Sequence, residues 1–440
     1  MKDYRNDLER IFMSAVSYAD PEHLVRSRVL FEDGSLIVDS EHAFAKKKIF
    51  LFAFGKAACG MTKGFLSVCD VDKGIVVSNK VEKFPENIQM IKSGHPLPDE
   101  GSLRGAEAML KLAGEADEDT LCVFLASGGG SAILSLPAFG ISPDEKKKTF
   151  DMLIRSGACI EDINIVRRHI SAVKGGRLAE AALPAQCVTL AMSDVLSGAP
   201  EAIASGPTYC DHTTWRDVAE VIARYGLLKK IPDRVMDVIE RGEAGELPET
   251  IKRNISEYKY NTLGSNFGGL KTASDMAHMM GYNVRVYGHL DCDVAQAAQI
   301  MAGRVAENLI HATEGPVCMI FGGEVTVNVI GDGRGGRCQQ LALEYLLTEK
   351  PAGTYALCAS TDGMDGDSDA AGAFADDDIN PEGAEEAALN NDAYTFFDRE
   401  ESLLRIGLTG TNINDLYIIL IPKLETEAVM QALAEDSSYN

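Results

Sequence analysis

The sequence has few positive charges for its size. Its 440 residues include 42 Lys and Arg against 66 Asp and Glu, which gives a formal net charge of −24. Nucleic acids and anionic membrane surfaces both bind basic faces, so this charge balance argues against both partners. If the substrate is an anion, its site must be a local group of Lys and Arg in a negative molecule.

The sequence also lacks paired cysteines. Its 10 cysteines are scattered, with no CxxC motif and no Cys/His cluster at zinc spacing. Several lie inside apolar runs, which is typical of buried free thiols in a reducing compartment. The first 16 residues carry acidic side chains and no uninterrupted apolar stretch. We therefore expect no signal peptide and a cytoplasmic protein.

One segment is long and uncharged enough to imitate a membrane span, residues 121–143. It contains three consecutive glycines, four serines and two prolines, so a buried strand, a glycine turn and a helix start explain it better. No solenoid-type repeat and no low-complexity segment is present in the sequence. The composition is that of an ordinary globular chain long enough to bury large cores.

Short apolar runs alternate with longer helical patterns along the chain. The expected strands are Ile49–Phe54, Gly74–Ser78, Gln89–Lys92, Leu121–Ala126, Cys187–Met192, Asn283–Tyr287, Val317–Phe321, Val325–Ile330, Tyr355–Ala359 and Leu416–Ile421. Most are continuous apolar runs, as strands covered on both faces should be. The expected helices include Glu100–Gly114, Asp144–Ser156, Ser265–Met280, Val294–Ala312 and Gln339–Leu347. This alternation predicts an α/β fold with a mostly parallel sheet and helices on both of its faces.

Residues 211–255 break the alternation, because they are polar, helical in pattern and without a strong strand. We place the domain connection in this segment. The predicted domains are 1–240, with a Rossmann-like sheet, and 241–440, a second α/β domain.

A glycine turn is the strongest indication of a binding site. Ser127, Gly128, Gly129, Gly130 and Ser131 follow the buried strand Leu121–Ala126. Glycines let backbone N–H groups converge on a ligand, and a helix start behind them adds positive potential. The turn is predicted to cradle an anion, most naturally phosphate, whereas a merely flexible turn is the alternative.

Lys56 occupies a similar place after the first strong strand, in the run Phe54-Gly55-Lys56-Ala57. The spacing is not that of a Walker A motif. A lysine at a strand-to-helix turn nevertheless stands where an anion would bind, although an exposed surface lysine fits the pattern too.

The segment Gly331–Arg337 contains the glycine spacing GxGxxG. That spacing alone is a weak sign of dinucleotide binding, and the acidic residue of that motif would come late, at Asp362. Two arginines inside the segment favour phosphate recognition over NAD.

Further candidates follow other strands. Asp194 ends the strand Cys187–Met192 and Asp362 follows Tyr355–Ala359, where ligands of open α/β sheets bind. Arg168 and Lys174 lie in a basic stretch before the strand that leads to Asp194. Among the histidines, His95 and His169 could act as acids or bases, although structural histidines are more common.

Eight motifs, in order along nearly the whole chain, together resemble a known family. They read FGKA, SGHPLPDEGS, SGGGSA, HISAVKGGRLA, SDV followed by IASGPT, GRGGR, STDGMDGDSDAAGA and TGTNINDL. This set resembles the glycerate kinases whose C-terminal part is called the MOFRL domain, here about residues 315–425. One departure is Cys338-Gln339-Gln340, where relatives usually show Asn-Gln-Glu.

The resemblance implies two α/β domains with a cleft between them and ATP-dependent phosphorylation of D-glycerate, usually at the 2-hydroxyl. It points to Lys56 and Arg337 as site residues, and it is compatible with a homodimer. The alternative activity is an NAD(P)-dependent hydroxypyruvate reductase, the name that older descriptions give to some members.

From both lines of reasoning we assign roles to particular residues. The turn Ser127–Ser131 binds the phosphates of ATP, with Asp362 as a further nucleotide contact. Lys56, Arg168, Lys174 and Arg337 supply positive charge for the substrate, and Lys56 and Arg337 act on the transferred group. Asp194 is the expected general base or ligand of Mg²⁺, with Asp362 as the second candidate.

Overall fold

A computed structural model describes residues 3–40, 42–45, 47–195, 198–253 and 258–425. The chain forms two compact units, each with its own six-stranded sheet. Residues Pro21–Leu263 form one, here called the continuous unit. Met1–Asp20 and Gly264–Asn440 form the other, the split unit, whose sequence is interrupted by the first.

These units differ from the predicted division at residue 240 in two places. Helix α1, Tyr4–Tyr18, belongs to the split unit because it packs along α11, Asn266–Met279. Most of the segment predicted as the domain connection belongs to the continuous unit, where it forms α9, Trp215–Arg224, and α10, Asp233–Glu243.

The continuous unit is built on a sheet with the strand order β6-β5-β4-β7-β8-β9. The neighbouring pairs from β6 to β8 are parallel, as the apolar runs predicted. The strands are β4 Lys48–Phe54, β5 Lys73–Ser78, β6 Ile88–Lys92, β7 Thr120–Ala126, β8 Gln186–Met192 and β9 Tyr258–Gly264. Every residue of β7 is buried, which fits a central strand covered on both faces.

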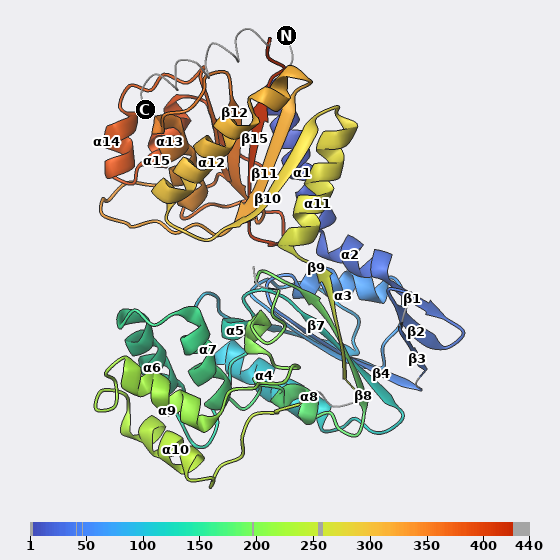
Figure 1. Cartoon of the computed structure of the whole chain (residues 1–440). Coiled ribbons are helices and arrows are strands. Elements are labelled where there is room, and N and C mark those ends of the chain that lie inside the picture. Colours follow the sequence, from blue (N-terminus) through green and yellow to red (C-terminus); the bar gives the residue numbers. More distant parts are fainter. Residues whose placement is uncertain (1–2, 41, 46, 196–197, 254–257, 426–440) are drawn as a thin grey trace. The chain divides into compact units, whose positions relative to one another are not determined.

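Helices cover both faces of this sheet (Figure 1): α3 lies on one face and α4 and α8 on the other. The helices are α2 Pro21–Arg28, α3 Ala58–Leu66, α4 Glu100–Ala113, α5 Gly130–Ile133 and α8 Arg177–Glu180, with a 3₁₀ turn at Ile203–Ser205. A small antiparallel sheet, not foreseen from the sequence, consists of β1 Val29–Glu32, β2 Ser35–Val38 and β3 His42–Ala45.

Four helices of the continuous unit gather beside the sheet around a core of their own (Figure 1). They are α6, Pro143–Arg155, and α7, Ile160–His169, together with α9 and α10. The indole ring of Trp215 lies at their centre and packs against Gly242, where a Cβ atom would overlap the ring. The hydrophobic positions of α9 and α10 therefore serve this helical core rather than a linker.

The split unit has a mixed sheet with the order β10-β11-β15-β12-β13-β14. Its strands are β10 Asn283–Leu290, β11 Val317–Gly323, β12 Tyr355–Ser360, β13 Gly372–Asp376, β14 Leu403–Leu404 and β15 Asp415–Ile421. Among the described strands of this sheet only β10 and β11 form a parallel pair, because β15 enters between β11 and β12 and runs antiparallel to both. The expected strand Val325–Ile330 is wrong: Thr326 makes one isolated bridge, to Asp293, since β15 already occupies the free edge of β11.

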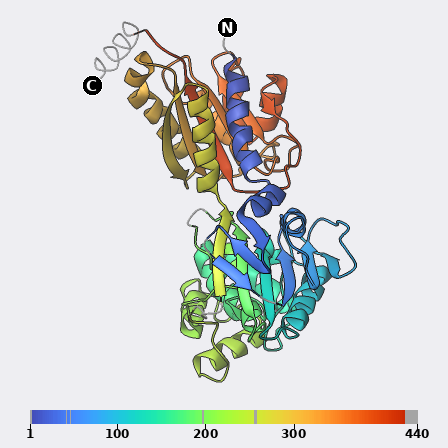
Figure 2. The same ribbon diagram turned by 90° about the vertical axis from the view of Figure 1, so that its right-hand side faces the viewer.

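Helices also cover both faces of the split unit's sheet. On one face α1 and α11 lie side by side (Figure 2), packed through Leu8, Ile11 and Phe12. The helices on the opposite face are α12 Val294–Asn308, with a 3₁₀ turn Ile310–Thr313, α13 Arg337–Leu347, α14 Ala384–Leu389 and α15 Ala393–Arg399.

Candidate active site

In the continuous unit, Lys56 and the glycine turn Ser127–Ser131 lie at the same edge of the sheet. Lys56 follows β4 and the turn follows β7, and these parallel strands are in register up to Phe54 and Ala126. The Lys56 backbone N–H donates to the Gly128 carbonyl at 2.9 Å, and the Ala57 N–H donates to Ser127 Oγ at 3.1 Å. The two turns thus form one structure at the carboxyl ends of the strands, where ligands of α/β sheets bind.

The glycines of this turn make room for side chains from other elements. A Cβ atom on Gly128 would overlap the carboxylate of Asp194, which follows β8. Gly129 has φ of +77°, and a Cβ atom there would lie 2.9 Å from the His95 ring and 3.0 Å from Lys56 Cγ. The structure therefore brings together Lys56, Asp194 and the predicted cradle, and it adds His95.

Burial, and next the charge of Lys56, lower the pKa of His95 below its ordinary value. The imidazole is therefore neutral at neutral pH and able to accept a proton. His95 precedes Pro96 in the loop between β6 and α4, and the sequence offered it as an acid or base without placing it beside Lys56.

The helix expected behind the glycine turn is short. α5 ends after Gly130–Ile133, and the Gly130 N–H is already directed at the Ser127 carbonyl at 3.4 Å. Four residues carry little helix dipole, so any anion binding here depends on the turn and its neighbours rather than on a helix terminus. The Ser131 hydroxyl is hydrogen bonded to that of Ser205 at 2.7 Å.

Two predicted substrate-binding residues are buried in the framework of the unit. The Lys174 ammonium donates to the carbonyls of Ala204 at 2.8 Å and Gly130 at 3.4 Å, from directly below the glycine turn. Burial, and next the charges of Lys146 and Arg167, lower the Lys174 pKa well below its ordinary value. Arg168 forms an ion pair with buried Asp211 at 3.0 Å. Both side chains hold the unit together in this structure.

A pocket of about 670 Å³ opens next to the turn, with Gly129, Ser131 and His95 in its wall. Another part of the wall comes from α6 and α7 and carries three cations that the sequence analysis did not single out, Lys146, Lys147 and Arg167. A signal for Lys146 was present. It shares one face of α6 with buried Thr149 and Leu153, at helical spacing, although it stands among three consecutive lysines.

In the split unit, Arg337 begins α13 and is engaged by two carboxylates. Its Nε and Nη2 donate to the Asp415 carboxylate at 2.6 and 3.2 Å, and its Nη1 donates to Glu324 at 2.6 Å. Burial alone would lower the Arg337 pKa, but the hydrogen bonds and charge of Asp415 raise it. The guanidinium keeps two further N–H groups beyond these three contacts.

The glycine-rich loop before Arg337 is packed against protein rather than open to a ligand. The Gly331 N–H donates to Asn391 Oδ1 at 3.0 Å, and the Gly333 N–H donates to the Asn390 carbonyl at 3.0 Å. At the start of α13, the N–H groups of Cys338 and Gln339 donate to the Asp365 carboxylate at 3.1 and 2.8 Å. A carboxylate of the protein thus occupies the place where this loop was predicted to bind phosphate.

Asp365 and Asp362 sit close in sequence but in different surroundings. Burial raises the pKa of Asp365 to about 7, against the lowering effect of its two backbone hydrogen bonds. Asp362, the predicted nucleotide contact, is half-buried and accepts from the Ser360 hydroxyl and the Met364 N–H, both at 3.1 Å. It follows β12 of the split unit, whereas the glycine turn belongs to the continuous unit.

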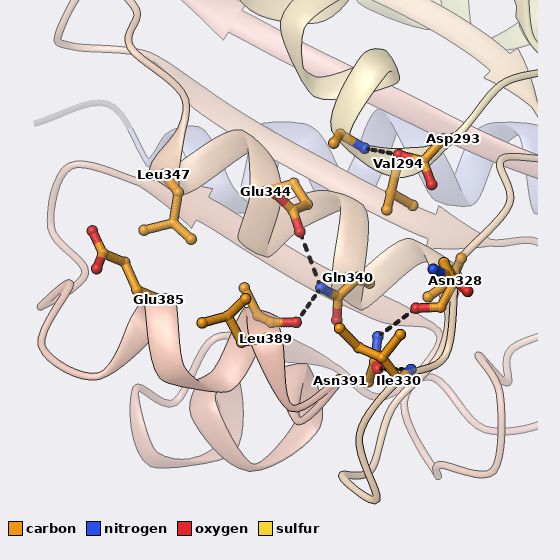
Figure 3. Close-up of a pocket in the computed structure, with 13 residues that line it drawn as sticks. Asp293, Val294, Asn328, Ile330, Gln340, Glu344, Leu347, Glu385, Leu389 and Asn391 are labelled. Carbon is orange, nitrogen blue, oxygen red and sulfur yellow. Dashed lines mark hydrogen bonds between the residues drawn. The ribbon is translucent and has the colours of Figure 1, made fainter.

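A second pocket, of about 420 Å³, lies within the split unit between α13, α14 and the start of α12 (Figure 3). Gln340 crosses it and donates to Glu344 at 3.2 Å and to the Ala388 carbonyl at 3.1 Å. The ionisable side chains in its wall are acidic: Asp293, Glu344 and Glu385. This lining disfavours an anionic ligand.

Within the described ranges, no three His, Cys, Asp or Glu side chains gather closely enough to hold a metal ion by themselves. In the same ranges, every helix is too short or too polar to span a bilayer. All ten cysteines are free thiols.

Comparisons with known proteins give a consistent result. The family model described as a domain of unknown function (DUF4147) matches residues 7–240, and that of the MOFRL family matches residues 317–415. The glycerate 2-kinase of Pyrococcus horikoshii is 35% identical over 425 residues, 94% of this chain and 96% of its own. The D-glycerate 2-kinase of Thermotoga maritima is 35% identical over 388 residues, 85% of this chain and 91% of its own.

A protein of Agrobacterium vitis called a putative hydroxypyruvate reductase is 34% identical over 435 residues, 95% of this chain and 94% of its own. The crystal structure of a glycerate kinase from Thermotoga maritima is similar in fold, with a TM-score of 0.82 and 33% identity. That match covers 93% of this chain and 97% of the other. Sequence and fold agree over nearly the whole length, and the chain belongs to the glycerate kinase family that combines a DUF4147 domain with a MOFRL region.

Proposed function

We propose that this chain is an ATP-dependent kinase that phosphorylates D-glycerate on its 2-hydroxyl to give 2-phosphoglycerate. The observation that carries the proposal is the 35% identity to a glycerate 2-kinase over 94% of the chain. The grouping of Lys56, His95 and Asp194 around the glycine turn supports it, because phosphoryl transfer depends on positioning and charge neutralisation more than on covalent chemistry by the protein.

Each residue of this group has a proposed role. The backbone of Gly128–Gly130, with Ser131, binds phosphate oxygens, and Lys56 neutralises the charge that develops on the transferred group. Asp194 accepts the proton of the attacking hydroxyl. Neutral His95, beside Lys56, is a second candidate for that proton.

Arg337 keeps a proposed role in the split unit, with its two remaining N–H groups available to an oxyanion. Its contacts with Asp415 and Glu324 would hold the guanidinium in a fixed orientation. Asp362, also in the split unit, keeps its proposed role as a contact to the nucleotide. Lys174 acts by holding the glycine turn, and Arg168 acts only through the core.

Mg²⁺ is part of the proposal as the ion that accompanies ATP. Such an ion commonly uses one or two carboxylates, with phosphates and water completing its shell. Asp194, the carboxylate beside the glycine turn, fits that limited requirement. When bound, the ion would neutralise phosphate charge. We also propose a reducing, cytoplasmic location, in keeping with ten free thiols, and we leave a homodimer as an expectation.

The reductase alternative has less support from the structure. A dinucleotide pyrophosphate would need free N–H groups at the start of α13 and a strand before the glycine loop. The N–H groups are bonded to Asp365, and residues 325–330 form no strand.

The test is to incubate the protein with ATP, Mg²⁺ and D-glycerate and to identify the product by ³¹P NMR. We expect ADP and 2-phosphoglycerate. Formation of 3-phosphoglycerate would contradict the position of transfer, and absence of ADP would contradict the kinase. Oxidation of NADH by hydroxypyruvate, followed by absorbance, would support the reductase instead.

A further inference from the structure

Three basic side chains lie close together at the 670 Å³ pocket without a carboxylate partner among the described residues: Lys146 and Arg167 in its wall and Lys174 next to them. Lys146 is 5% exposed, and its ammonium donates a hydrogen bond to Ser135 Oγ at 3.3 Å. Arg167 donates to the neutral side chain of Asn164 at 2.7 Å and stacks over the Phe150 ring at 5.2 Å. Lys174 is bonded to backbone carbonyls. Neither Lys146 nor Arg167 forms an ion pair within the described ranges.

Carboxylates lie at and around the pocket, but in the described part of the chain none is paired with Lys146 or Arg167. Asp99 caps α4, and on α10, which packs against α6, Asp237 is paired with Arg234 at 2.9 Å. On the other side of α7, Asp211 is paired with Arg168. The remaining ionisable groups of the pocket wall are His95, Glu100, Asp144, Lys147 and Asp151. These carboxylates and Lys147 are exposed to solvent, whereas Lys146 is buried in the wall and, like Arg167, has no carboxylate partner among the described residues.

Buried like charges are costly unless an anion offsets them or the amines release their protons. Burial, and next the charge of Arg167, lower the pKa of Lys146 to about 7. At neutral pH the empty pocket is therefore near the point at which Lys146 loses its proton. An anion entering the pocket would favour the charged form again, so its binding and proton uptake are linked.

We propose that Lys146 and Arg167 form an oxyanion subsite that holds the carboxylate or phosphate of one of the two anionic substrates, and that Lys146 takes up a proton when that anion binds. The inference rests on the proposed function, because it is the kinase reaction that supplies two anionic substrates. It goes further than that function because it assigns a substrate-binding role to two residues, Lys146 and Arg167, that lie outside the group of Lys56 and Asp194. The pocket reaches that group through Gly129 and His95, so a substrate anchored on Arg167 would extend toward Lys56.

The first experiment is calorimetric titration of the full-length wild-type protein at pH 8, in two buffers of different ionisation enthalpy. Three probes are used separately: D-glycerate, ADP and inorganic phosphate. For the anion that uses the subsite we expect uptake of about 0.5–1 proton per site and an affinity that falls as the pH rises from 7 to 9. Uptake with D-glycerate alone assigns the subsite to the carboxylate, and uptake with ADP and phosphate assigns it to the nucleotide. Binding of all probes without proton uptake would overturn the inference.

The second experiment compares variants on the same helix. Lys146→Gln should weaken binding of that anion at least tenfold and abolish the proton uptake, whereas Lys148→Gln, which changes an exposed lysine two residues away, should leave both unchanged. Arg167→Gln should weaken binding while part of the uptake remains. This variant keeps the test available if Lys146→Gln fails to fold. Unchanged affinity and uptake in both Lys146→Gln and Arg167→Gln would overturn the inference.

Failure of the inference is distinguishable from failure of the proposed function. Suppose that the wild-type protein forms ADP from ATP and D-glycerate, and that Lys146→Gln and Arg167→Gln do the same with unchanged KM. The proposed kinase activity is then supported, and the proposed subsite is contradicted. If the wild-type protein forms no ADP, the kinase falls, whatever the titrations show.

Discussion

The two glycine-rich segments that the sequence singled out use their glycines in opposite ways. In the turn Ser127–Ser131, the missing Cβ atoms admit side chains that can do chemistry, namely Lys56, His95 and Asp194. In the loop Gly331–Gly336, they admit backbone and capping groups: Gly331 and Gly333 lie against Asn390, and Gly336 lies against Asp365. The first segment borders a pocket with cations in its wall, and the second is closed by its own hydrogen bonds.

The difference shows what a glycine motif leaves undetermined. Glycines permit close approach, but the group that approaches is set by the tertiary structure. Three features decide whether a ligand or a group of the protein fills the space beside the glycines. They are the strand before the motif, the side chains that follow it and the charge of the adjacent pocket. Substitutions in and around the two segments test this contrast.

Lys56→Ala should abolish most activity while leaving the fold intact. Lys56 is half-buried beside the glycine turn, and its loss removes a charge from the transferred group. We expect a decrease in kcat/KM of at least about 100-fold, or roughly 2.7 kcal/mol of transition-state stabilisation. The measurement is ADP formation with D-glycerate, with exposed Lys83→Ala as the control. Wild-type kinetics in folded Lys56→Ala would remove this lysine from the site.

Arg337→Lys tests whether the second segment contributes to the reaction. Lysine keeps the charge but cannot hold Asp415 through two parallel hydrogen bonds and also reach Glu324. If Arg337 acts on an oxyanion, ADP formation should fall about 10- to 100-fold while calorimetric binding of ATP is retained. A variant with a lower melting temperature and unchanged ADP formation would instead show that Arg337 only pairs with the buried Asp415 carboxylate.

A pair of glycine substitutions tests the contrast directly. Gly129→Ala introduces strain at positive φ and pushes on His95 and Lys56, so kcat/KM should fall about tenfold with a stability loss of about 1 kcal/mol. Gly333→Ala places a Cβ atom 2.5 Å from the Asn390 carbonyl oxygen, and it should cost about 1–3 kcal/mol of stability with KM for glycerate unchanged. Urea unfolding and steady-state kinetics measure both. Normal kcat/KM in Gly129→Ala together with reduced kcat/KM in Gly333→Ala would contradict the assignment of the active site to the first segment.

Asp365→Asn should change how stability depends on pH. The native protein holds a proton on Asp365 up to about pH 7, whereas the unfolded chain releases it near pH 4. Because the native state then binds more protons, this residue makes the free energy of unfolding fall as pH rises from about 4 to 7. In Asp365→Asn that decrease should be smaller, relative to the wild-type protein and to the exposed control Asp367→Asn. Parallel pH curves would show that Asp365 is ionised throughout.

Much of the continuous unit could be predicted, because its strands are local apolar runs that end in recognisable turns. β4, β7 and β8 lie where expected, and so do Lys56 and Asp194 at their ends. The split unit was harder, because β15 reaches its place between β11 and β12 from the far end of the chain, and only long-range pairing excludes a strand at 325–330. Lys146 was missed for a related reason: its helical spacing marks the inward face of α6, but only the packing of α6 on α7 and α10 shows that this lysine is buried.

The interruption of the split unit has a consequence for how the chain is made. Residues Pro21–Leu263 are contiguous, so the continuous unit can fold while the rest of the chain is still being synthesised. α1 is synthesised before that unit, but its apolar partners on α11, β12 and β15 come only after it. Until those partners are synthesised, Leu8, Ile11 and Phe12 cannot be buried in this core. The apolar face of α1 is then exposed, and a chaperone could bind it. Helix α1 is thus translated before the continuous unit but reaches its packing partners after it.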